Sequence, residues 1–215
     1  MSDSTLETNG LQIRYRKNKV ALEAHPPRNH TVVLFHGRAF SLDNWYEIGT
    51  VETLGERGYP VYAIDLPSGT ASKSDKVNYA KLRDYVPILE GIFSKLEIGN
   101  PERKVTIVGP SMGGGFALAY AVAHPEAVEG LVLISPAVHA LEQSSLRKIK
   151  IPVMLVWGEG DDVFTLEQYG VPLRDKLENC RLVKLKNAGH AAYLNKPKEF
   201  NEMLLDFLEE ISRKR

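Results

Sequence analysis

Short apolar runs recur along the chain, each five or six residues long and rich in valine, isoleucine and leucine. A run that is apolar at every position suits a strand covered on both faces, which is the pattern of a parallel sheet between two layers of helices. The chain has six such runs, at residues 31–35, 60–64, 104–108, 131–135, 152–157 and 181–185. Each of them predicts a buried strand.

Other stretches of the chain follow different patterns. Residues 11–16 alternate between apolar and polar positions, which predicts part of an edge hairpin. Stretches of helical character predict helices at 41–57, 78–96, 112–124, 165–178 and 197–213. This alternation of strand and helix predicts an α/β fold with a mostly parallel, doubly wound sheet and helices on both faces. No repeat or linker interrupts it, so we expect one domain over residues 1–215.

The overall composition narrows the classes of function. Lys and Arg together number 27, as do Asp and Glu, and the balance argues against a nucleic-acid partner, which usually requires a basic excess. Cys180 is the single cysteine, so no intrachain disulfide can form. Residues 1–10 lack the pattern of a signal peptide, and no segment is apolar for long enough to cross a membrane. We therefore expect a cytoplasmic protein with no membrane partner.

Three strand ends carry the residue types of nucleophilic catalysis. Ligands of parallel sheets bind beyond the carboxyl ends of the strands. Ser111 follows the run at 104–108, Asp161 follows 152–157, and His190 follows 181–185. A serine hydroxyl is a weak nucleophile that needs a base, and an aspartate holds the imidazole of that base in the required tautomer. The order Ser, Asp, His predicts a catalytic triad.

The serine lies in the pattern Gly-x-Ser-x-Gly, formed by residues 109–113, between a predicted strand and a predicted helix. This arrangement is typical of a nucleophile elbow, a tight turn that projects the hydroxyl above the sheet at a helix N-terminus. Gly109 and Gly113 would be required because a side chain there would collide with neighbouring backbone. The alternative is that Ser111 merely caps the following helix.

Five segments carry a resemblance to a known family: HGRAFSLDNW, AIDLPSGTASKS, VGPSMGGG, VWGEGDDVF and NAGHAAYLNKP. Together they resemble the α/β-hydrolase superfamily over nearly the whole chain, and in particular its small, lidless branch called alpha/beta-hydrolase domain-containing type fourteen. The resemblance implies hydrolysis of small esters or other acyl groups through an acyl-serine, without a metal or another cofactor. It implies no particular substrate beyond a small-molecule acyl compound.

The family's oxyanion hole would come from the backbone N–H groups of Arg38 and Met112. Arg38 departs from the small or apolar residue often found at its position, and its side chain either points to solvent or reaches over the pocket and favours an anionic acyl group. His36 is expected to brace this turn rather than to react. Asp161 occupies the family's acid position, with Asp162 expected to cap the turn or the helix that begins near Thr165, and with Glu159 as a weaker rival.

Other polar residues give weaker signals. No pair of the remaining histidines has the spacing of metal ligands, so no metal site is expected. His139 could line the site because it lies at a strand end, and Tyr193 either packs in the core or lines the pocket.

The connection after residues 131–135 is short. From Ser135 to Ile151 there are 151 − 135 = 16 positions, enough for one short helix and too few for a cap domain. We expect an open pocket that favours small acyl groups or a substrate displayed on a larger molecule, unless the loop at 68–77 covers it.

Two other classes of function remain open. A serine-dependent acyltransferase or perhydrolase would share the first half-reaction, with a thiol, alcohol or peroxide replacing water. A non-catalytic ligand-binding protein could keep the same fold. A dinucleotide-binding fold is rejected, because no Gly-x-Gly-x-x-Gly follows the first parallel strand. The sequence leaves the oligomeric state undetermined.

Overall fold

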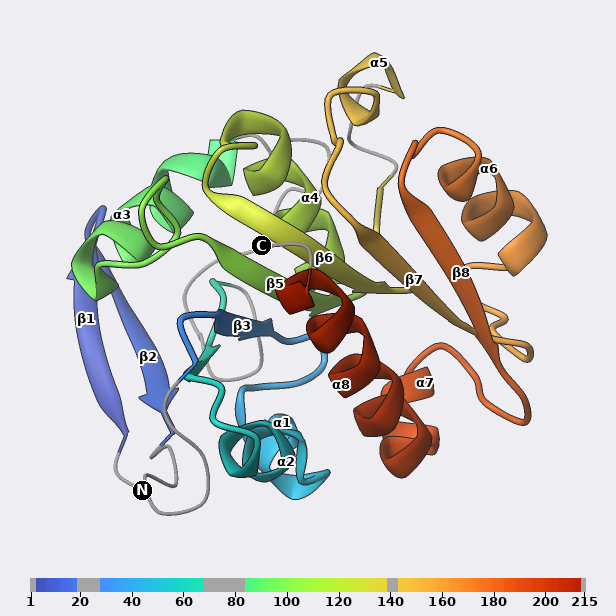
Figure 1. Ribbon diagram of the computed structural model, residues 1–215, viewed down its shortest axis with the longest axis horizontal. Coiled ribbons are helices and arrows are strands. Elements are labelled where there is room, and N and C mark those ends of the chain that lie inside the picture. Colours follow the sequence, from blue (N-terminus) through green and yellow to red (C-terminus); the bar gives the residue numbers. More distant parts are fainter. Residues whose placement is uncertain (1–2, 19–27, 68–83, 139–142, 214–215) are drawn as a thin grey trace.

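The computed structural model describes residues 3–18, 28–67, 84–138 and 143–213. Its centre is an eight-stranded sheet with the order β1-β2-β4-β3-β5-β6-β7-β8 (Figure 1). The strands are β1 (Ser4–Thr8), β2 (Leu11–Lys17), β3 (Thr31–Phe35), β4 (Val61–Ile64), β5 (Val105–Pro110), β6 (Val128–Ile134), β7 (Val153–Gly158) and β8 (Cys180–Leu185).

Six of these strands, β3 to β8, run parallel, which confirms the predicted parallel sheet. The strand β3 lies between β4 and β5, so Val32 pairs with Val61 on one side and with Thr106 on the other. The first two strands form the predicted hairpin at one edge, and β2 also pairs antiparallel with β4. The hairpin therefore adjoins the parallel strands directly.

Helices cover both faces of the sheet (Figure 1). They are α1 (Asp43–Glu47), α2 (Thr50–Glu56), α3 (Val86–Leu96), α4 (Met112–Ala123), α5 (Gln143–Leu146), α6 (Val171–Arg174), α7 (Ala192–Asn195) and α8 (Pro197–Arg213). One apolar core unites α3, α4 and α6 with one face, and a second core unites α1, α2, α7 and α8 with the other.

Successive side chains along a strand point alternately into these two cores. In β3, Val33 and Phe35 face the first core, whereas Val32 and Leu34 face the second. All four side chains are fully buried. Because side chains alternate along a strand, burial on both faces requires an uninterrupted apolar run, which is the pattern in the sequence.

Three of the predicted helices differ in detail. Of the helix expected at 78–96, residues 78–83 lie outside the described residues, and α3 begins at Val86. The helix expected at 41–57 is divided into α1 and α2 by Gly49, whose φ of 72° is left-handed. The helix expected at 165–178 begins as a π-turn, Leu166–Gly170, and continues as the single turn α6. Pro172 lies in the first turn of α6, where a missing N–H costs no helical hydrogen bond.

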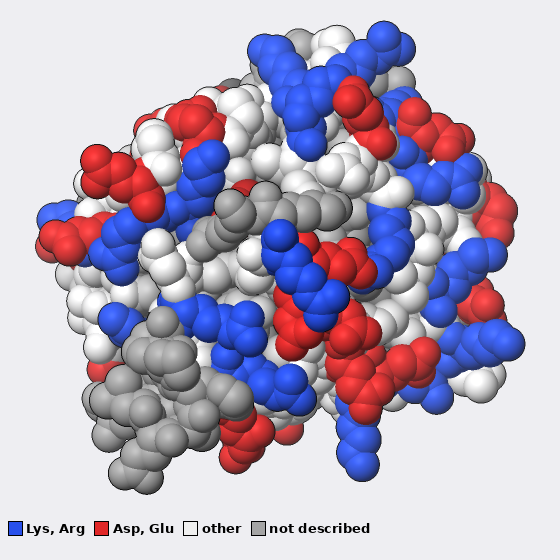
Figure 2. Space-filling model, in the orientation of Figure 1, with Lys and Arg blue, Asp and Glu red and all other residues white. Residues whose placement is uncertain are grey.

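The described part of the connection after β6 contains α5 and no cap domain, as expected. Among the described residues, no helix is long and apolar enough to span a bilayer. On the face that carries α8, basic and acidic side chains are interspersed rather than separated by sign (Figure 2).

Candidate functional site

The serine of the Gly-x-Ser-x-Gly pattern lies between β5 and α4 in a strained backbone conformation. Ser111 has a φ of 47°, a region that residues with a Cβ rarely adopt. Two backbone hydrogen bonds hold it there: its N–H donates to Ile134 O at 2.8 Å, and its carbonyl accepts from Ala137 N at 2.8 Å. Ile134 ends β6 and Ala137 lies three residues beyond it, so the neighbouring strand and the loop that follows it fix the turn.

The flanking glycines permit this turn. A Cβ on Gly109 would lie 2.5 Å from the carbonyl carbon of Gly113, and a Cβ on Gly113 would lie 2.7 Å from the carbonyl oxygen of His36. The predicted collisions with neighbouring backbone are therefore confirmed. The second contact also means that α4 begins directly against the end of β3.

His190 and Asp161 meet at the neighbouring strand ends. The Nδ1 atom of His190 lies 2.9 Å from Oδ2 and 3.1 Å from Oδ1 of Asp161. A carboxylate only accepts hydrogen bonds, so Nδ1 carries the proton and the Nε2 lone pair is left for a second partner. The ring of Phe164 packs edge-on against the imidazole, with the centroids 5.1 Å apart.

The carboxylate of Asp161 is completely buried, and both of its oxygens accept hydrogen bonds. Its Oδ1 accepts the backbone N–H groups of Val163 and Phe164 at 3.0 and 2.9 Å, in addition to the contact with His190. A buried carboxylate needs such donors to offset the loss of hydration. The rivals Asp162 and Glu159 are exposed. Of the three acids, Asp161 is the one in contact with the imidazole.

A pocket of about 330 Å³ lies at the carboxyl ends of the parallel strands. Ser111 and His190 both line it, together with the turn 37–40 and the apolar side chains of Ala137, Val163 and Phe164. The sequence analysis did not identify Phe164, because its contact with His190 depends on two loops that are distant in the sequence. Tyr193 is not among the described residues that line the pocket; it is buried against Trp45 and Phe200.

Arg38 and Met112 are the residues whose N–H groups the family resemblance assigns to the oxyanion hole. Arg38 belongs to the turn after β3, lines the pocket and is exposed. Met112 is the first residue of α4, so its N–H has no acceptor within the helix. His36 braces the turn, as expected: it is fully buried, and its Nδ1 lies 2.8 Å from Gly37 O.

Two other predictions concern metals and His139. Among the described residues, no group of three or more His, Cys, Asp or Glu side chains could hold a metal ion. His139 and the loop at 68–77 lie outside the described residues.

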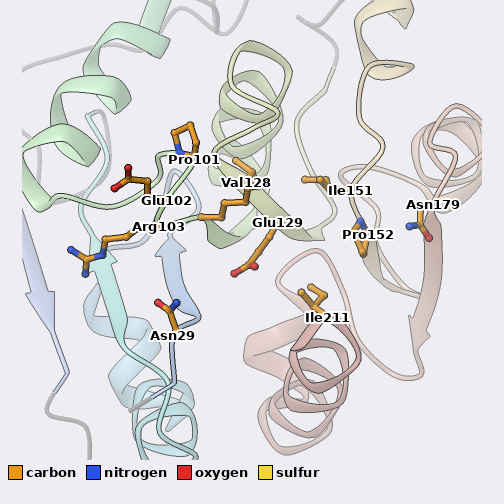
Figure 3. Close-up of a pocket in the computed structure, with 11 residues that line it drawn as sticks. Asn29, Pro101, Glu102, Arg103, Val128, Glu129, Ile151, Pro152, Asn179 and Ile211 are labelled. Carbon is orange, nitrogen blue, oxygen red and sulfur yellow. The ribbon is translucent and has the colours of Figure 1, made fainter. Parts of the chain in front are cut away.

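A larger pocket, of about 560 Å³, lies at the amino-terminal ends of the strands (Figure 3). Most of its lining residues lie just before strands or begin them, as Lys104 precedes β5, Val128 begins β6 and Pro152 precedes β7; Ile211 comes from α8. Ligands of parallel sheets bind at the carboxyl ends of the strands. Its most buried acid, Glu129, lies 3.1 Å from His30 Nε2. The smaller pocket is therefore the candidate active site.

Comparison with known proteins shows the family to which the chain belongs. Residues 26–149, more than half of the chain, match the family described as serine aminopeptidase, S33. ABHD14A of Mus musculus is 36% identical over 182 residues, which cover 84% of this chain and 70% of that relative. The human protein named "Putative protein-lysine deacylase ABHD14B" is 29% identical over 210 residues, covering 96% of this chain and 95% of that relative.

A solved structure shares the whole architecture. The crystal structure of a "predicted CIB-like hydrolase" from Thermoplasma acidophilum superposes with a TM-score of 0.83 and 25% identity, covering 97% of this chain and 98% of that one. The family match and the identity to ABHD14A extend the likeness from fold to sequence. The chain therefore belongs to the α/β-hydrolases, in the serine aminopeptidase S33 family and the ABHD14 branch.

Proposed function

We propose that this protein is a serine hydrolase that cleaves small acyl groups through an acyl-serine intermediate. Ser111 is the nucleophile, His190 the general base and Asp161 the acid that orients His190. The observation that carries the proposal is the pairing of a strained serine with an Asp161–His190 hydrogen bond at one pocket. A hydrolase family supplies the reaction class.

The first half-reaction follows from the tautomer of His190. Asp161 holds the proton on Nδ1, so Nε2 is available to accept the proton of the Ser111 hydroxyl as Oγ attacks the acyl carbon. The protonated imidazole then gives this proton to the leaving group. In the second half-reaction, water attacks the acyl-serine and His190 serves as base again.

The negative charge of each tetrahedral intermediate falls on the former carbonyl oxygen. The backbone N–H groups of Arg38 and Met112 are the proposed donors to this oxygen. One such donor contributes roughly 100- to 1,000-fold to kcat. Both donors are backbone groups. Arg38 can therefore serve as a donor although its side chain is larger than the small or apolar residue often found at this position.

The direct test uses a serine-reactive fluorophosphonate and p-nitrophenyl acetate. Wild-type protein should be labelled on Ser111 and should hydrolyse the ester. Ser111→Ala should lose both activities while its melting temperature stays near that of wild type. Labelling at another serine, or ester hydrolysis that survives in Ser111→Ala, would show that the nucleophile is wrong.

The acyl preference follows from the pocket. A volume of about 330 Å³ suits short acyl groups, as does the lack of a cap in the described part of the connection after β6. With p-nitrophenyl esters from acetate to decanoate, we expect kcat/KM to be highest between acetate and butyrate and to fall beyond roughly six carbons. A deep tunnel would instead gain about 0.8 kcal/mol for each buried methylene, so a maximum at decanoate would contradict the open pocket.

A second candidate function is removal of an acyl group from a lysine side chain on a protein. The name of ABHD14B states this activity for that relative. An apolar side chain at the pocket also favours it: Val163 is 56% exposed, so it is placed to contact a large substrate.

Val163→Ser separates the two candidates. For an acetyl-lysine peptide we expect this variant to raise KM several-fold, while kcat/KM for p-nitrophenyl acetate stays near the wild-type value. Failure of wild-type protein to deacylate such peptides would leave small esters or other acyl compounds as the substrate. Adding a thiol or alcohol to the ester assay distinguishes an acyltransferase, since the acceptor then accumulates the acyl group.

A further inference from the structure

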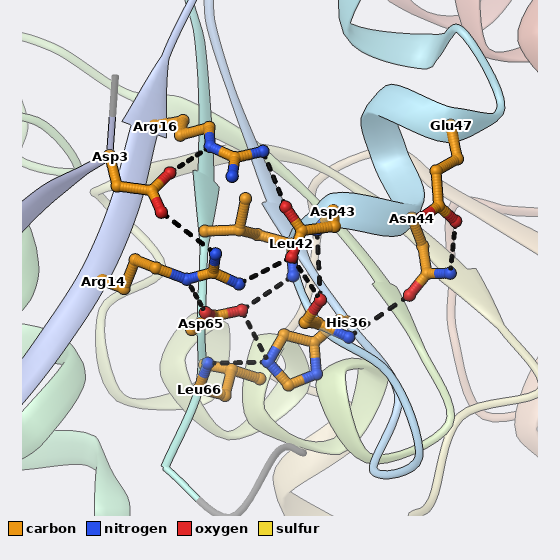
Figure 4. Close-up of polar contacts among 11 residues, drawn as sticks. Asp3, Arg14, Arg16, His36, Leu42, Asp43, Asn44, Glu47, Asp65 and Leu66 are labelled. Atoms are coloured by element: carbon orange, nitrogen blue, oxygen red, sulfur yellow. Dashed lines mark hydrogen bonds and ion pairs between the residues drawn. The ribbon is translucent and has the colours of Figure 1, made fainter. Parts of the chain in front are cut away.

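The turn that carries Arg38 is held from outside the pocket by a buried carboxylate. The Oδ1 atom of Asp65 accepts the backbone N–H of Leu42 at 2.7 Å, at the end of the turn where α1 begins. The same oxygen lies 3.6 Å from His36 Nε2, at the start of the turn. Asp65 follows β4 directly, and its side chain is only 3% exposed. Asp65 therefore holds the end of the segment 36–42 through Leu42, and the next residue, Leu66, holds its start by donating its N–H to His36 Nε2 (Figure 4).

Arg14 supplies the charge that this carboxylate requires. Its Nε lies 2.5 Å from Asp65 Oδ2, and its two terminal nitrogens lie 2.8 Å from Asp43 and 3.1 Å from Asp3. Partial burial alone would favour the neutral form, but hydrogen bonds to Asp43 and Asp65 outweigh it and raise the pKa of Arg14 above its ordinary value. A planar guanidinium can serve several carboxylates at once, which a lysine ammonium on its flexible stem does less well.

The contacts of Asp43 extend the same restraint to the turn itself. The Ser41 hydroxyl donates to Asp43 Oδ2 at 2.9 Å, and Arg16 lies 2.7 Å from Asp43 Oδ1. Arg14 and Arg16 both belong to β2, so the edge hairpin holds the C-terminal end of the turn through two carboxylates.

The orientation of the Arg38 amide follows from the other end of the turn. Leu66 N–H donates to His36 Nε2 at 2.9 Å, so the proton of this buried imidazole is on Nδ1 and is donated to Gly37 O. In a trans peptide the carbonyl and the following N–H point in opposite directions. Fixing Gly37 O therefore fixes the direction of the Arg38 N–H.

We propose that Arg14 is a positioning residue: by holding the Asp65 carboxylate in place, it sets the Arg38 N–H toward the acyl oxygen. This inference rests on the proposed function, since it gives Arg14 of the edge hairpin a positioning role in the same reaction. A positioning residue should alter kcat, because the oxyanion forms only during the reaction, and should leave KM for a small ester nearly unchanged.

The test compares Arg14→Gln and Arg14→Lys with Arg181→Gln as a matched control. Arg181 is also a strand arginine paired with a carboxylate, Glu210 at 2.8 Å, but β8 places it toward the opposite edge of the sheet. With active sites counted by fluorophosphonate titration, we expect Arg14→Gln to lower kcat for p-nitrophenyl acetate roughly 10- to 100-fold. Arg14→Lys should recover part of this loss, and Arg181→Gln should retain the wild-type kcat.

A second readout follows the Arg38 amide directly. In the phosphonylated enzyme the phosphoryl oxygen occupies the oxyanion position, so the ¹H–¹⁵N signal of Arg38 should shift downfield in wild type and less in Arg14→Gln. A kcat within twofold of wild type, an effect confined to KM, an unchanged Arg38 signal or an equal loss in Arg181→Gln would each overturn the positioning role.

The double variant Arg14→Gln/Asp65→Asn covers the case in which the single variant does not fold. It removes both charges, and the Asn carbonyl still accepts the Leu42 N–H. We expect it to fold and to have a kcat well below that of wild type; wild-type kcat in the double variant would overturn the proposal. If Ser111 of wild type is not labelled, the proposed function fails and this inference with it. If Ser111 is labelled and the Arg14 variants match wild type, only this inference fails.

Discussion

At the residue scale, the two adjacent acids Asp161 and Asp162 have opposite surroundings. Asp161 is buried and accepts hydrogen bonds from His190, Val163 and Phe164, whereas Asp162 is exposed. The spacing of the sequence motif placed the acid at Asp161, and the buried contacts give the physical reason. The packing of Phe164 on His190 has no local sequence pattern, because it depends on the meeting of two loops.

Replacing Asp161 by Asn should lower kcat by roughly 1,000- to 10,000-fold, because the amide no longer selects the His190 tautomer with its proton on Nδ1. Asp162→Asn should change kcat less than threefold. The measurement is kcat for p-nitrophenyl acetate at neutral pH, with melting temperatures to establish that both variants are folded. The reverse ranking of the two variants would contradict the proposed role of Asp161.

At the scale of elements, the sheet was predictable because buried strands require continuous apolar runs. The breaks within helices were not predicted, although Gly49 and Pro172 signal them. At Gly49 the left-handed φ ends α1, and at Pro172 the chain starts a new helical turn after a π-turn. The short helix α7 has no apolar pattern of its own; its four residues pack between β7 and α8.

The junction between β5 and α4 gives an element-scale prediction. Gly113→Ala should destabilise the protein by about 3 kcal/mol or more, because its Cβ meets the backbone of β3 at His36. Gly49→Ala should cost only about 1–2 kcal/mol, since there the substitution meets no neighbour within 4 Å and pays only for a left-handed φ. Urea unfolding curves measure both values. Similar losses at the two positions would argue against a close approach of α4 to β3.

At the scale of the whole molecule, the ion network in Figure 4 joins the edge hairpin to the centre of the sheet. Arg14 and Asp65 are 51 positions apart in the sequence. Their contact depends on the antiparallel pairing of β2 with β4, which brings Tyr15 opposite Ile64. The sequence predicted the hairpin but not its neighbour in the sheet, so it could not predict this contact.

Stability toward acid should depend on His36. Burial lowers the pKa of His36 below its ordinary value, although the hydrogen bond to Gly37 opposes this effect. The unfolded imidazole takes up a proton near pH 6.5 while the folded one resists it, so the free energy of unfolding should fall as the pH drops below about 6.5. This group can contribute a slope of up to about 1.4 kcal/mol per pH unit, down to its folded pKa.

The measurement is the free energy of urea unfolding between pH 7.5 and 5 for wild type and His36→Gln. The variant should be less stable at pH 7.5, because it loses buried contacts, and its stability should fall less steeply with acid. Parallel curves for the two proteins would show that protonation of other groups governs acid unfolding.

The position of β3 between β4 and β5 also sets an order of events during folding. Thr31 pairs with Val105, which lies 105 − 31 = 74 positions later in the sequence, and His190 lies 190 − 105 = 85 positions beyond Val105. Contacts between such distant segments form slowly because a long loop must close first. During refolding, the helical circular dichroism signal should therefore return before esterase activity. The site of Ser111, Asp161 and His190 is complete only when β8, the strand that precedes His190, has joined the sheet.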